Sequence, residues 1–161
     1  MTTCTSTIDQ VQEDTQLAIR DVFSTMLSLD VSERPPSALA PDPEGQVVSS
    51  VGFIGKLTGA VYLYCTVGFA KVLTGRMLGL DEAEVESGDM INDAVGELSN
   101  MIVGSVKSRL CDRGSACTLT LPSIIRGQHL SVEKPAQVAT RVIGFASAQH
   151  HFLAEIFVKE V

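Results

Sequence analysis

An acid and an amide, Glu97 and Asn100, lie three residues apart in the stretch DAVGELSNMIVG, and a glycine lies near each of them. A carboxylate can pair with a cation, and an amide oxygen can accept a hydrogen bond from water without titrating. The two glycines, Gly96 and Gly104, each cost a helix interior roughly 1 kcal/mol relative to alanine. Their presence indicates a helix face that another group approaches closely.

The surrounding residues predict the helix that must position this pair. Apolar residues recur with helical spacing from a plausible cap at Ser87 to about Cys111. With 100° per residue counted from Glu97, the predicted buried stripe covers an arc from about 40° to 180°. Its members are Ile91, Ala94, Val95, Leu98, Met101, Ile102, Ser105 and Val106.

The opposite side of this helix is predicted to carry Asp93, Glu97 and Asn100 on one strip, with Gly96 and Gly104 beside them. Two structural explanations compete with a functional one. The strip could be the solvated face of a surface helix, or the glycines could let another helix pack closely. A purely solvated face would favour alanine, lysine or glutamate at the glycine positions, which favours a functional strip.

The rest of the chain predicts an α+β fold, in which a largely antiparallel sheet packs against long helices. Asp9 is the expected N-cap of the first helix, and the turn between the last two strands is expected near Ala148 and Gln149. The predicted elements, in order, are helix 8–28, strands 46–55 and 58–67, helix 68–79, the long helix, strand 117–122, and strands 137–147 and 150–160.

Length and composition indicate one domain spanning residues 1–161. Residues 1–7 are expected to be disordered, and residues 31–45 are expected to form a proline-rich loop. The formal net charge of −7 argues against nucleic-acid and anionic-membrane binding. The N-terminus does not read as a signal peptide, and four cysteines without CxxC spacing favour a cytoplasmic protein with free thiols.

Other candidate sites are weaker. His150 and His151 begin the last predicted strand, where neighbouring side chains point to opposite faces, so they are not expected to chelate one metal ion. Cys65 is expected in the core. Cys111 and Cys117 flank the end of the long helix, where unpaired packing is favoured over a regulatory thiol pair.

The two longest predicted helices hint at an internal repeat. Each helix precedes a set of strands. An alignment of DVFSTML with GELSNMI pairs Phe23 with Leu98, Ser24 with Ser99 and Met26 with Met101.

The pattern D-x-x-x-E-x-x-N-x-x-x-G in DAVGELSNMIVG resembles the signature helix of the CheC/CheX/FliY family of chemotaxis phosphatases. The stretches VFSTML, GFIGKLTGAVYLYCT and RMLG are also similar to CheX in order and spacing. The resemblance covers about Val22 to Val158 and implies a CheX-like fold with a degenerate repeat. CheC-type members carry E-x-x-N on both repeat helices, whereas the alignment above places Val22 and Thr25 at those positions of the first helix.

The resemblance implies a phosphatase that hydrolyses the aspartyl phosphate of a CheY-type response regulator. Glu97 and Asn100 would be catalytic, with Asn100 orienting the attacking water, while Asp93, Gly96 and Gly104 would contact the partner. The protein would need no cofactor of its own, because the regulator brings Mg²⁺. The resemblance to CheX-like proteins also implies that this chain forms a homodimer. The alternative is a non-catalytic CheX-like module that binds or scaffolds a response regulator or a flagellar or chemotaxis partner.

Overall fold

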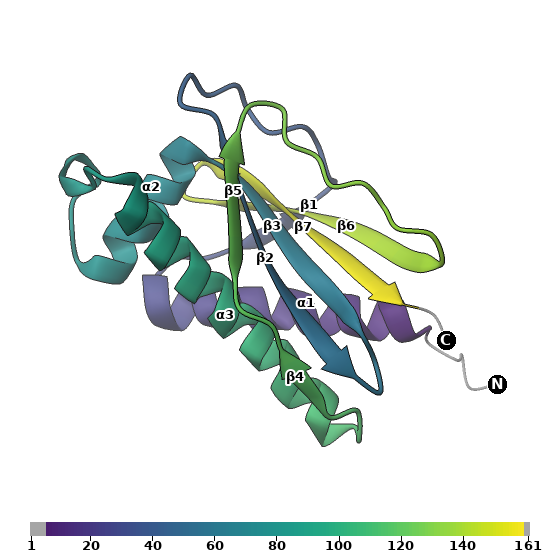
Figure 1. The fold of residues 1–161 in the computed structure, drawn as a ribbon. Helices are drawn as coiled ribbons and strands as arrows, with labels where there is room; N and C mark the ends of the chain where they lie inside the picture. The colour runs from purple at the N-terminus through teal and green to yellow at the C-terminus, as the bar shows by residue number, and fades with distance from the viewer. Residues whose placement is uncertain (1–5, 160–161) are drawn as a thin grey trace.

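The computed structural model describes residues 6–159, in which a seven-stranded antiparallel sheet carries its α-helices on one face (Figure 1). The strand order is β1-β6-β7-β3-β2-β4, and β5 pairs with β2 beyond this path. The strands are β1 Ser32–Arg34, β2 Gln46–Gly55, β3 Gly59–Thr66, β4 Cys117–Leu119, β5 Ser123–Gly127, β6 Val138–Ser147 and β7 His150–Lys159. The α+β prediction is therefore confirmed.

Three α-helices pack on the sheet: α1 Thr7–Val22, α2 Val67–Leu78 and α3 Gly88–Asp112. A π-helical turn, η1 Phe23–Leu27, continues α1 and ends where Ser28 adopts a left-handed φ of 53°. A short 3₁₀ turn, η2 Glu82–Glu84, precedes α3. Within residues 6–159, no helix is long and apolar enough to cross a membrane.

Most predicted elements are present, and the differences lie at edges and ends. The two hairpins form as expected, and the β6–β7 turn places Ala148 and Gln149 at positive φ, which suits a tight turn between twisted strands. Two strands, β1 and β5, are absent from the elements that the sequence predicts, and the residues of β1 are all exposed. Neither strand shows the apolar alternation on which a strand prediction rests.

The start of α1 differs from the prediction. Ser6, and not Asp9, is the N-cap, because the Ser6 side chain accepts a hydrogen bond from the Asp9 backbone N–H. Ser6 and Thr7 are therefore part of an ordered helix start, contrary to the expected disorder. The rest of that expectation, for residues 1–5, lies outside the described residues.

The face of the sheet toward the helices forms the core. Alternate residues of β2 point to it and are fully buried, among them Val47, Val51 and Phe53. Phe152 of β7 stacks on Phe23 at the end of α1, with ring centroids 5.1 Å apart, and also contacts Phe69 of α2 and Phe145 of β6. This aromatic cluster fixes α1 and α2 against the sheet.

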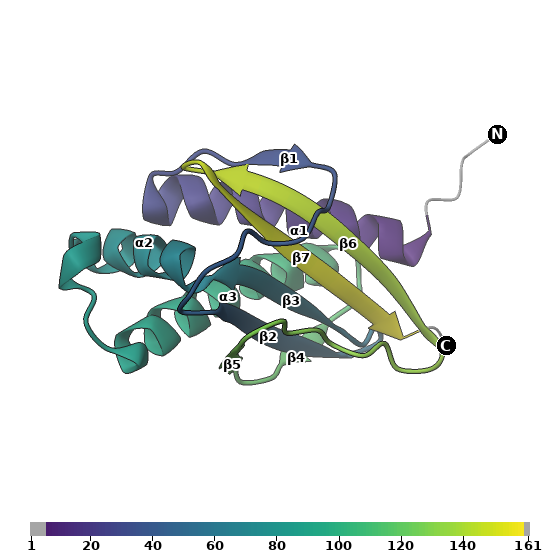
Figure 2. The same cartoon turned by 90° about the horizontal axis from the view of Figure 1, so that it is seen from above.

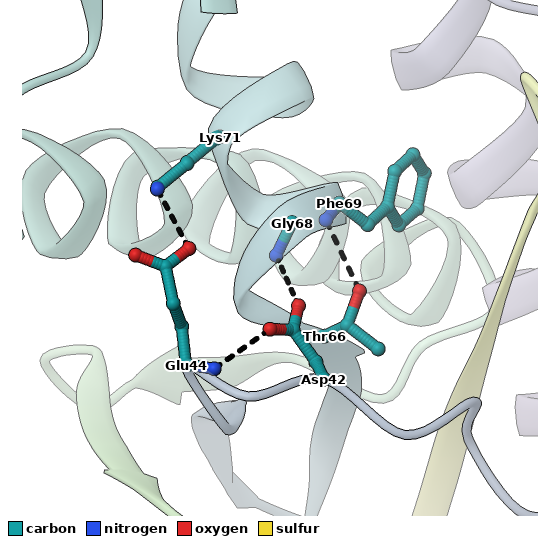
Figure 3. A network of polar contacts seen from close by, with 6 residues as sticks. All are labelled: Asp42, Glu44, Thr66, Gly68, Phe69 and Lys71. Atoms are coloured by element: carbon teal, nitrogen blue, oxygen red, sulfur yellow. Dashed lines mark hydrogen bonds and ion pairs between the residues drawn. The ribbon is translucent and has the colours of Figure 1, made fainter. Parts of the chain in front are cut away.

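The proline-rich loop is held at the start of α2 (Figure 3). Asp42 accepts hydrogen bonds from the backbone N–H groups of Gly68 and Glu44, both at 2.8 Å. Thr66 caps α2 by accepting from the Phe69 N–H, and Lys71 pairs with Glu44 at 2.7 Å. The bonds from the Gly68 and Phe69 N–H groups satisfy donors that a helix start leaves without intrahelical partners.

The helix α1 lies across β6 and β7, whereas α3 lies across β2 (Figure 2). The two helices also contact each other through charged side chains. Arg113, which directly follows α3, pairs with the buried Asp14 of α1, and Arg109 of α3 pairs with Asp21 at 3.1 Å. These ion pairs hold α3 along α1.

Candidate functional site

The sheet and a cap fix the rotation of α3. Ser87 caps the helix by accepting a hydrogen bond from the Met90 N–H at 3.2 Å, as predicted. Ser99 faces the sheet, and its hydroxyl lies 2.5 Å from that of Ser49 on β2. Leu98 and Ile102 are buried beside it. This anchoring turns the positions on the far side of the helix toward solvent.

The α3 strip, which we define as Asp93, Glu97, Asn100 and Gly104, lies on that far side. Asp93 and Glu97 are exposed, and Asn100 is half-buried. Glu97 and Asn100 are separated by about 4.5 Å along the helix axis and about 60° around it. The five salt bridges among residues 6–159 include neither Asp93 nor Glu97. Both carboxylates are therefore available to a cation on another molecule.

The two glycines of the motif have different surroundings. A Cβ at Gly104 would meet nothing within 4 Å beyond its own helix, so this position is open. Gly96 is buried, and a Cβ there would lie 3.6 Å from Pro122 and 3.8 Å from Ile124. The predicted partner contact at Gly96 is thus wrong, because the connection between β4 and β5 and the β5 strand cover it. The neighbour that Gly96 admits is a segment of the same chain, Pro122 and Ile124.

The buried arc of α3 is wider than predicted, because β2, β4 and β5 all pack against this helix. Ser99 and Val103, which fall outside the predicted stripe, are about 1% exposed. Met101 and Ser105, which were predicted inside it, are half-buried. The apolar periodicity of the sequence predicts a helix that packs on one side. In the structure α3 contacts two helices, α1 and α2, and three strands, β2, β4 and β5.

The connection between β4 and β5, which covers Gly96, carries a further candidate residue that the sequence does not point to. Leu121 is 87% exposed and directly precedes Pro122, which lies against Gly96. The backbone of Leu121 therefore lies near the turn of α3 that contains Gly96. Its exposed side chain is large enough to give a docked partner an apolar contact. Its position in a segment without regular periodicity gave the sequence no means of placing it.

The first helix does not match α3 in the way that the sequence alignment predicted. Val22 is buried at 7% exposure, whereas Glu97 is exposed. A carboxylate at the Val22 position would face the core, so the two positions are not equivalent. The alignment of Phe23 with Leu98 therefore gives the wrong register between the helices.

The remaining candidates take ordinary structural roles. His150 stacks on Phe69 with ring centroids 4.8 Å apart, whereas the exposed His151 lies 3.3 Å from Arg34, so the two imidazoles have different surroundings. Cys65 is in the core as expected, and burial raises the pKa of its thiol to about 12. This thiol therefore stays protonated and unreactive near neutral pH.

The family model described as chemotaxis phosphatase CheX matches residues 47–146, which include all of α3. The chain belongs to the CheX family. The match extends from β2 into β6, so the exposed α3 strip lies inside the family domain.

Individual relatives of this CheX-family chain are distant. It is 25% identical over 88 residues to the CheY-P phosphatase CheX of Thermotoga maritima. That alignment covers 54% of this chain and 56% of the relative, so the chain spans about half the length of the curated relative that it matches.

Solved structures share the fold over nearly the whole chain. A chemotaxis protein CheX from Desulfovibrio desulfuricans superposes with a TM-score of 0.79 at 24% identity, covering 93% of this chain and 99% of the other. The CheX-CheY-BeF3-Mg²⁺ complex from Borrelia burgdorferi superposes with a TM-score of 0.76 at 18% identity, covering 93% and 98%. At these identities the superpositions establish the CheX/CheC-like fold.

Proposed function

We propose that this chain hydrolyses the aspartyl phosphate of a CheY-type response regulator by docking α3 onto the regulator's active site. The observation that carries the proposal is the α3 strip, in which Glu97 and Asn100 share one outward face beside the open Gly104. Membership of a chemotaxis phosphatase family supports it. The Borrelia burgdorferi complex of CheX with CheY, BeF3 and Mg²⁺ also supports it, because a chain of that complex shares the fold of this chain.

The reaction asks little covalent chemistry of the phosphatase. The oxygen of a water molecule attacks the phosphorus in line with the leaving group, and the bond between phosphorus and the aspartate oxygen breaks. The products are inorganic phosphate, which takes up the water's protons to the degree that pH allows, and a free aspartate carboxylate. Because a carboxylate is a good leaving group, catalysis consists mainly of positioning the water and neutralising charge.

Asn100 orients the attacking water in this proposal. Its amide oxygen can accept a hydrogen bond from the water without carrying a charge that would repel the phosphoryl group. The half-buried position of Asn100 restricts its side chain, so less conformational entropy is lost on docking than for a fully exposed amide. The chain needs no cofactor for this step, because Mg²⁺ belongs to the regulator.

Glu97 holds the docked complex together in this proposal by pairing with a lysine of the regulator's active site. Its carboxylate is exposed and joins no salt bridge among residues 6–159, so pairing costs no existing contact. Asp93 lies one turn before it and adds negative potential for the same cation, at a cost of about 0.2–0.5 kcal/mol in like-charge repulsion. Gly104 admits the regulator's backbone, and Leu121 gives an apolar contact at the rim.

The second candidate is a CheX-like module that binds or scaffolds a regulator without turnover. The exposed acids would serve binding alone, but binding gives no reason for an amide beside them. Phosphate release from a phosphorylated regulator separates the two functions.

We also propose that the chain forms a homodimer through its sheet edges, where β1 and β4–β5 leave backbone groups unpaired. Light scattering on a size-exclusion column measures the molar mass in solution and checks this proposal.

Substitutions at the α3 strip test the proposal with a CheY-type regulator phosphorylated by a small acyl phosphate. We expect Asn100→Ala to slow dephosphorylation by about 10²-fold, or about 2.7 kcal/mol, while regulator binding stays nearly unchanged. Glu97→Ala should weaken both binding and turnover. Asp112→Ala, an exposed acid at the end of α3 and about 22 Å from Glu97, is the matched control. Wild-type rates in both strip variants would refute the assignment.

A further inference from the structure

The face of the sheet opposite α1 and α3 carries a hollow of about 330 Å³. Side chains of β3, β6 and β7 form its floor, and residues 38–39 and 129–132 form its two walls. These walls belong to the β1–β2 and β5–β6 connections, which pass on this side of the sheet in Figure 1. A second hollow, of about 530 Å³, shares residues of both walls and extends along the proline-rich loop. The recess is large enough for a small molecule.

Hydrogen bonds tie the two walls to the sheet and to each other. The backbone N–H of Leu130 donates to the Gln46 side chain of β2 at 3.2 Å. The Gln128 amide donates to the Pro43 carbonyl at 3.3 Å and so joins the two connections. The proline-rich loop is anchored in turn at the start of α2 (Figure 3). The hollow is therefore preformed, and a ligand that enters it would lose little free energy to ordering the walls.

The lining of this hollow is mainly apolar and contains one carboxylate. Among the eleven described residues that line it, Glu155 is the only acid, and neither lysine nor arginine occurs. A lining of this kind favours a ligand with an apolar body, and its single carboxylate favours a positive charge on that ligand. Five branched aliphatic side chains take part: Leu39, Leu130, Val132, Val142 and Leu153.

Glu155 is half-buried on β7 and lies among uncharged side chains. Its neighbours on this face of the sheet are Tyr62 and Val142, directly across on β3 and β6, and Leu153 and Phe157 along β7. One carboxylate oxygen, Oε1, accepts a hydrogen bond from the neutral Tyr64 hydroxyl at 2.9 Å. In the part of the chain that the structure describes, Glu155 forms no salt bridge. A half-buried carboxylate attracts a cation more strongly than a fully solvated one does, because less water screens the charges.

We propose that this hollow binds a small organic ammonium ion, that is, a primary amine on a short branched aliphatic or aromatic stem. The ammonium group pairs with the Glu155 oxygen that Tyr64 does not use, and the stem lies among the five aliphatic side chains. An alkyl amine is protonated near neutral pH, as the lysine side chain is. The site lies on the other side of the sheet from α3, so this inference is independent of the function proposed for the α3 strip.

Two other kinds of cation fit this hollow less well. A divalent metal ion needs several ligand atoms, and residues 6–159 contain no group of three or more acidic, histidine or cysteine side chains that could hold one. A guanidinium group binds best through both carboxylate oxygens, and one of those of Glu155 already accepts from Tyr64. An ammonium group is a compact charge for which one free carboxylate oxygen suffices.

The test compares isoamylamine with isoamyl alcohol, which has the same carbon skeleton and no charge. Binding to the full chain is followed near neutral pH by the shifts of backbone amide signals in two-dimensional NMR, which also locate the site. We expect isoamylamine to bind with a Kd of about 1 mM, as suits a ligand of about six heavy atoms, and the alcohol to bind about tenfold more weakly. The signals that move should be those of β7 and residues 129–132.

Two substitutions remove the negative charge that the amine needs. Glu155→Gln keeps the size of the side chain and should weaken isoamylamine binding by about tenfold. Its matched control is Glu133→Gln, at an exposed glutamate next to the wall of the hollow, which should bind as the wild type does. Val142→Lys places a lysine directly opposite Glu155, with which it can pair, so amine binding should also weaken by about tenfold without a lower unfolding temperature. Val142→Met, its uncharged control, should keep wild-type binding.

Several results would overturn this site. One is equal affinity for the amine and the alcohol, and another is the absence of any shift up to about 20 mM amine. Shifts centred away from β7 and residues 129–132 would overturn it by placing the amine elsewhere. Wild-type binding in Val142→Lys would do so too, even where Glu155→Gln does not fold. A failure of phosphate release refutes only the function proposed for α3, because these titrations involve neither the regulator nor the α3 strip.

Discussion

The hydroxyl oxygens of Ser49 on β2 and Ser99 on α3 lie 2.5 Å apart in the interior, where both residues are at most 1% exposed. Ser99 directly precedes Asn100, so this contact sets the rotation of α3 at the site itself. A slip of one residue would turn α3 by about 100° and carry Glu97 out of the strip. A polar pair in the core is directional, whereas the apolar contacts around it would tolerate small rotations.

The Ser49–Ser99 pair should contribute to stability as a unit. We expect Ser99→Ala or Ser49→Ala to lower the free energy of unfolding by about 1–3 kcal/mol, because each leaves one buried hydroxyl without its partner. The double alanine variant removes both polar groups and should cost less than the two single effects added. Urea denaturation in a double-mutant cycle measures this coupling.

The control for this cycle is Ser108→Ala on the exposed side of α3, where a loss under about 0.5 kcal/mol is expected. Strict additivity of the two core substitutions would show that the hydroxyls act independently and that the rotation of α3 is set by apolar packing alone.

The hairpins, the end of α2 and the start of α3 were predictable because local chemistry determines them, whereas Asp9 was the wrong cap for α1. Ser87, Gly79 and the turn at Ala148 and Gln149 each satisfy a backbone requirement that can be read within a few residues. The long helix and its exposed acids followed from periodicity. The strand β5 could not be predicted in this way, because its pairing with β2 is a long-range contact and its exposed residues show no alternation.

The candidate site was predicted only in part, for the same reason. Glu97 and Asn100 lie on one face whatever packs against the helix, so helix geometry sufficed. The cover over Gly96 depends on where Pro122 is placed by β4 and β5, which no local pattern contains. The error in aligning α1 with α3 shows only in burial, since short sequence identity placed the buried Val22 at the position of the exposed Glu97.

Tyr64 should make stability depend on alkaline pH. Burial raises the pKa of its hydroxyl, and the hydrogen bond that it donates to Glu155 at 2.9 Å raises the pKa further. An unfolded tyrosine ionises near pH 10, so the folded state keeps the proton longer than the unfolded state. This contribution is present in full below about pH 10 and is lost as the pH rises above it toward the folded pKa.

The measurement for Tyr64 is urea unfolding from pH 8 to pH 11 together with absorbance of the tyrosinate. Tyr64→Phe should show a smaller loss of stability with rising pH than the wild type. Glu155→Gln should let Tyr64 ionise at lower pH, because the neighbouring negative charge is gone. Equal slopes of stability against pH for the wild type and Tyr64→Phe would contradict this account.

Substitutions at Gly96 and Gly104 of α3 should differ in their effect on activity but agree in their effect on stability. Alanine at either position should stabilise the helix by up to about 1 kcal/mol, because a Cβ at Gly104 meets nothing within 4 Å and one at Gly96 meets Pro122 at an ordinary 3.6 Å. Gly104→Leu adds a side chain that protrudes from the strip, so kcat/KM for the phosphorylated regulator should fall by more than about tenfold. Gly96→Ala, covered by the chain itself, should keep the wild-type kcat/KM.

The comparison of these variants distinguishes a docking surface from a solvated face. If the α3 strip only contacts water, Gly104→Leu changes neither binding nor turnover, since solvent accommodates the added side chain. If the strip enters a partner's active site, the same variant unfolds at a temperature no lower than the wild type and yet loses activity. Because Gly96→Ala undergoes the same gain in helix propensity, a loss of activity confined to Gly104→Leu follows from blocked approach and not from stiffening of α3.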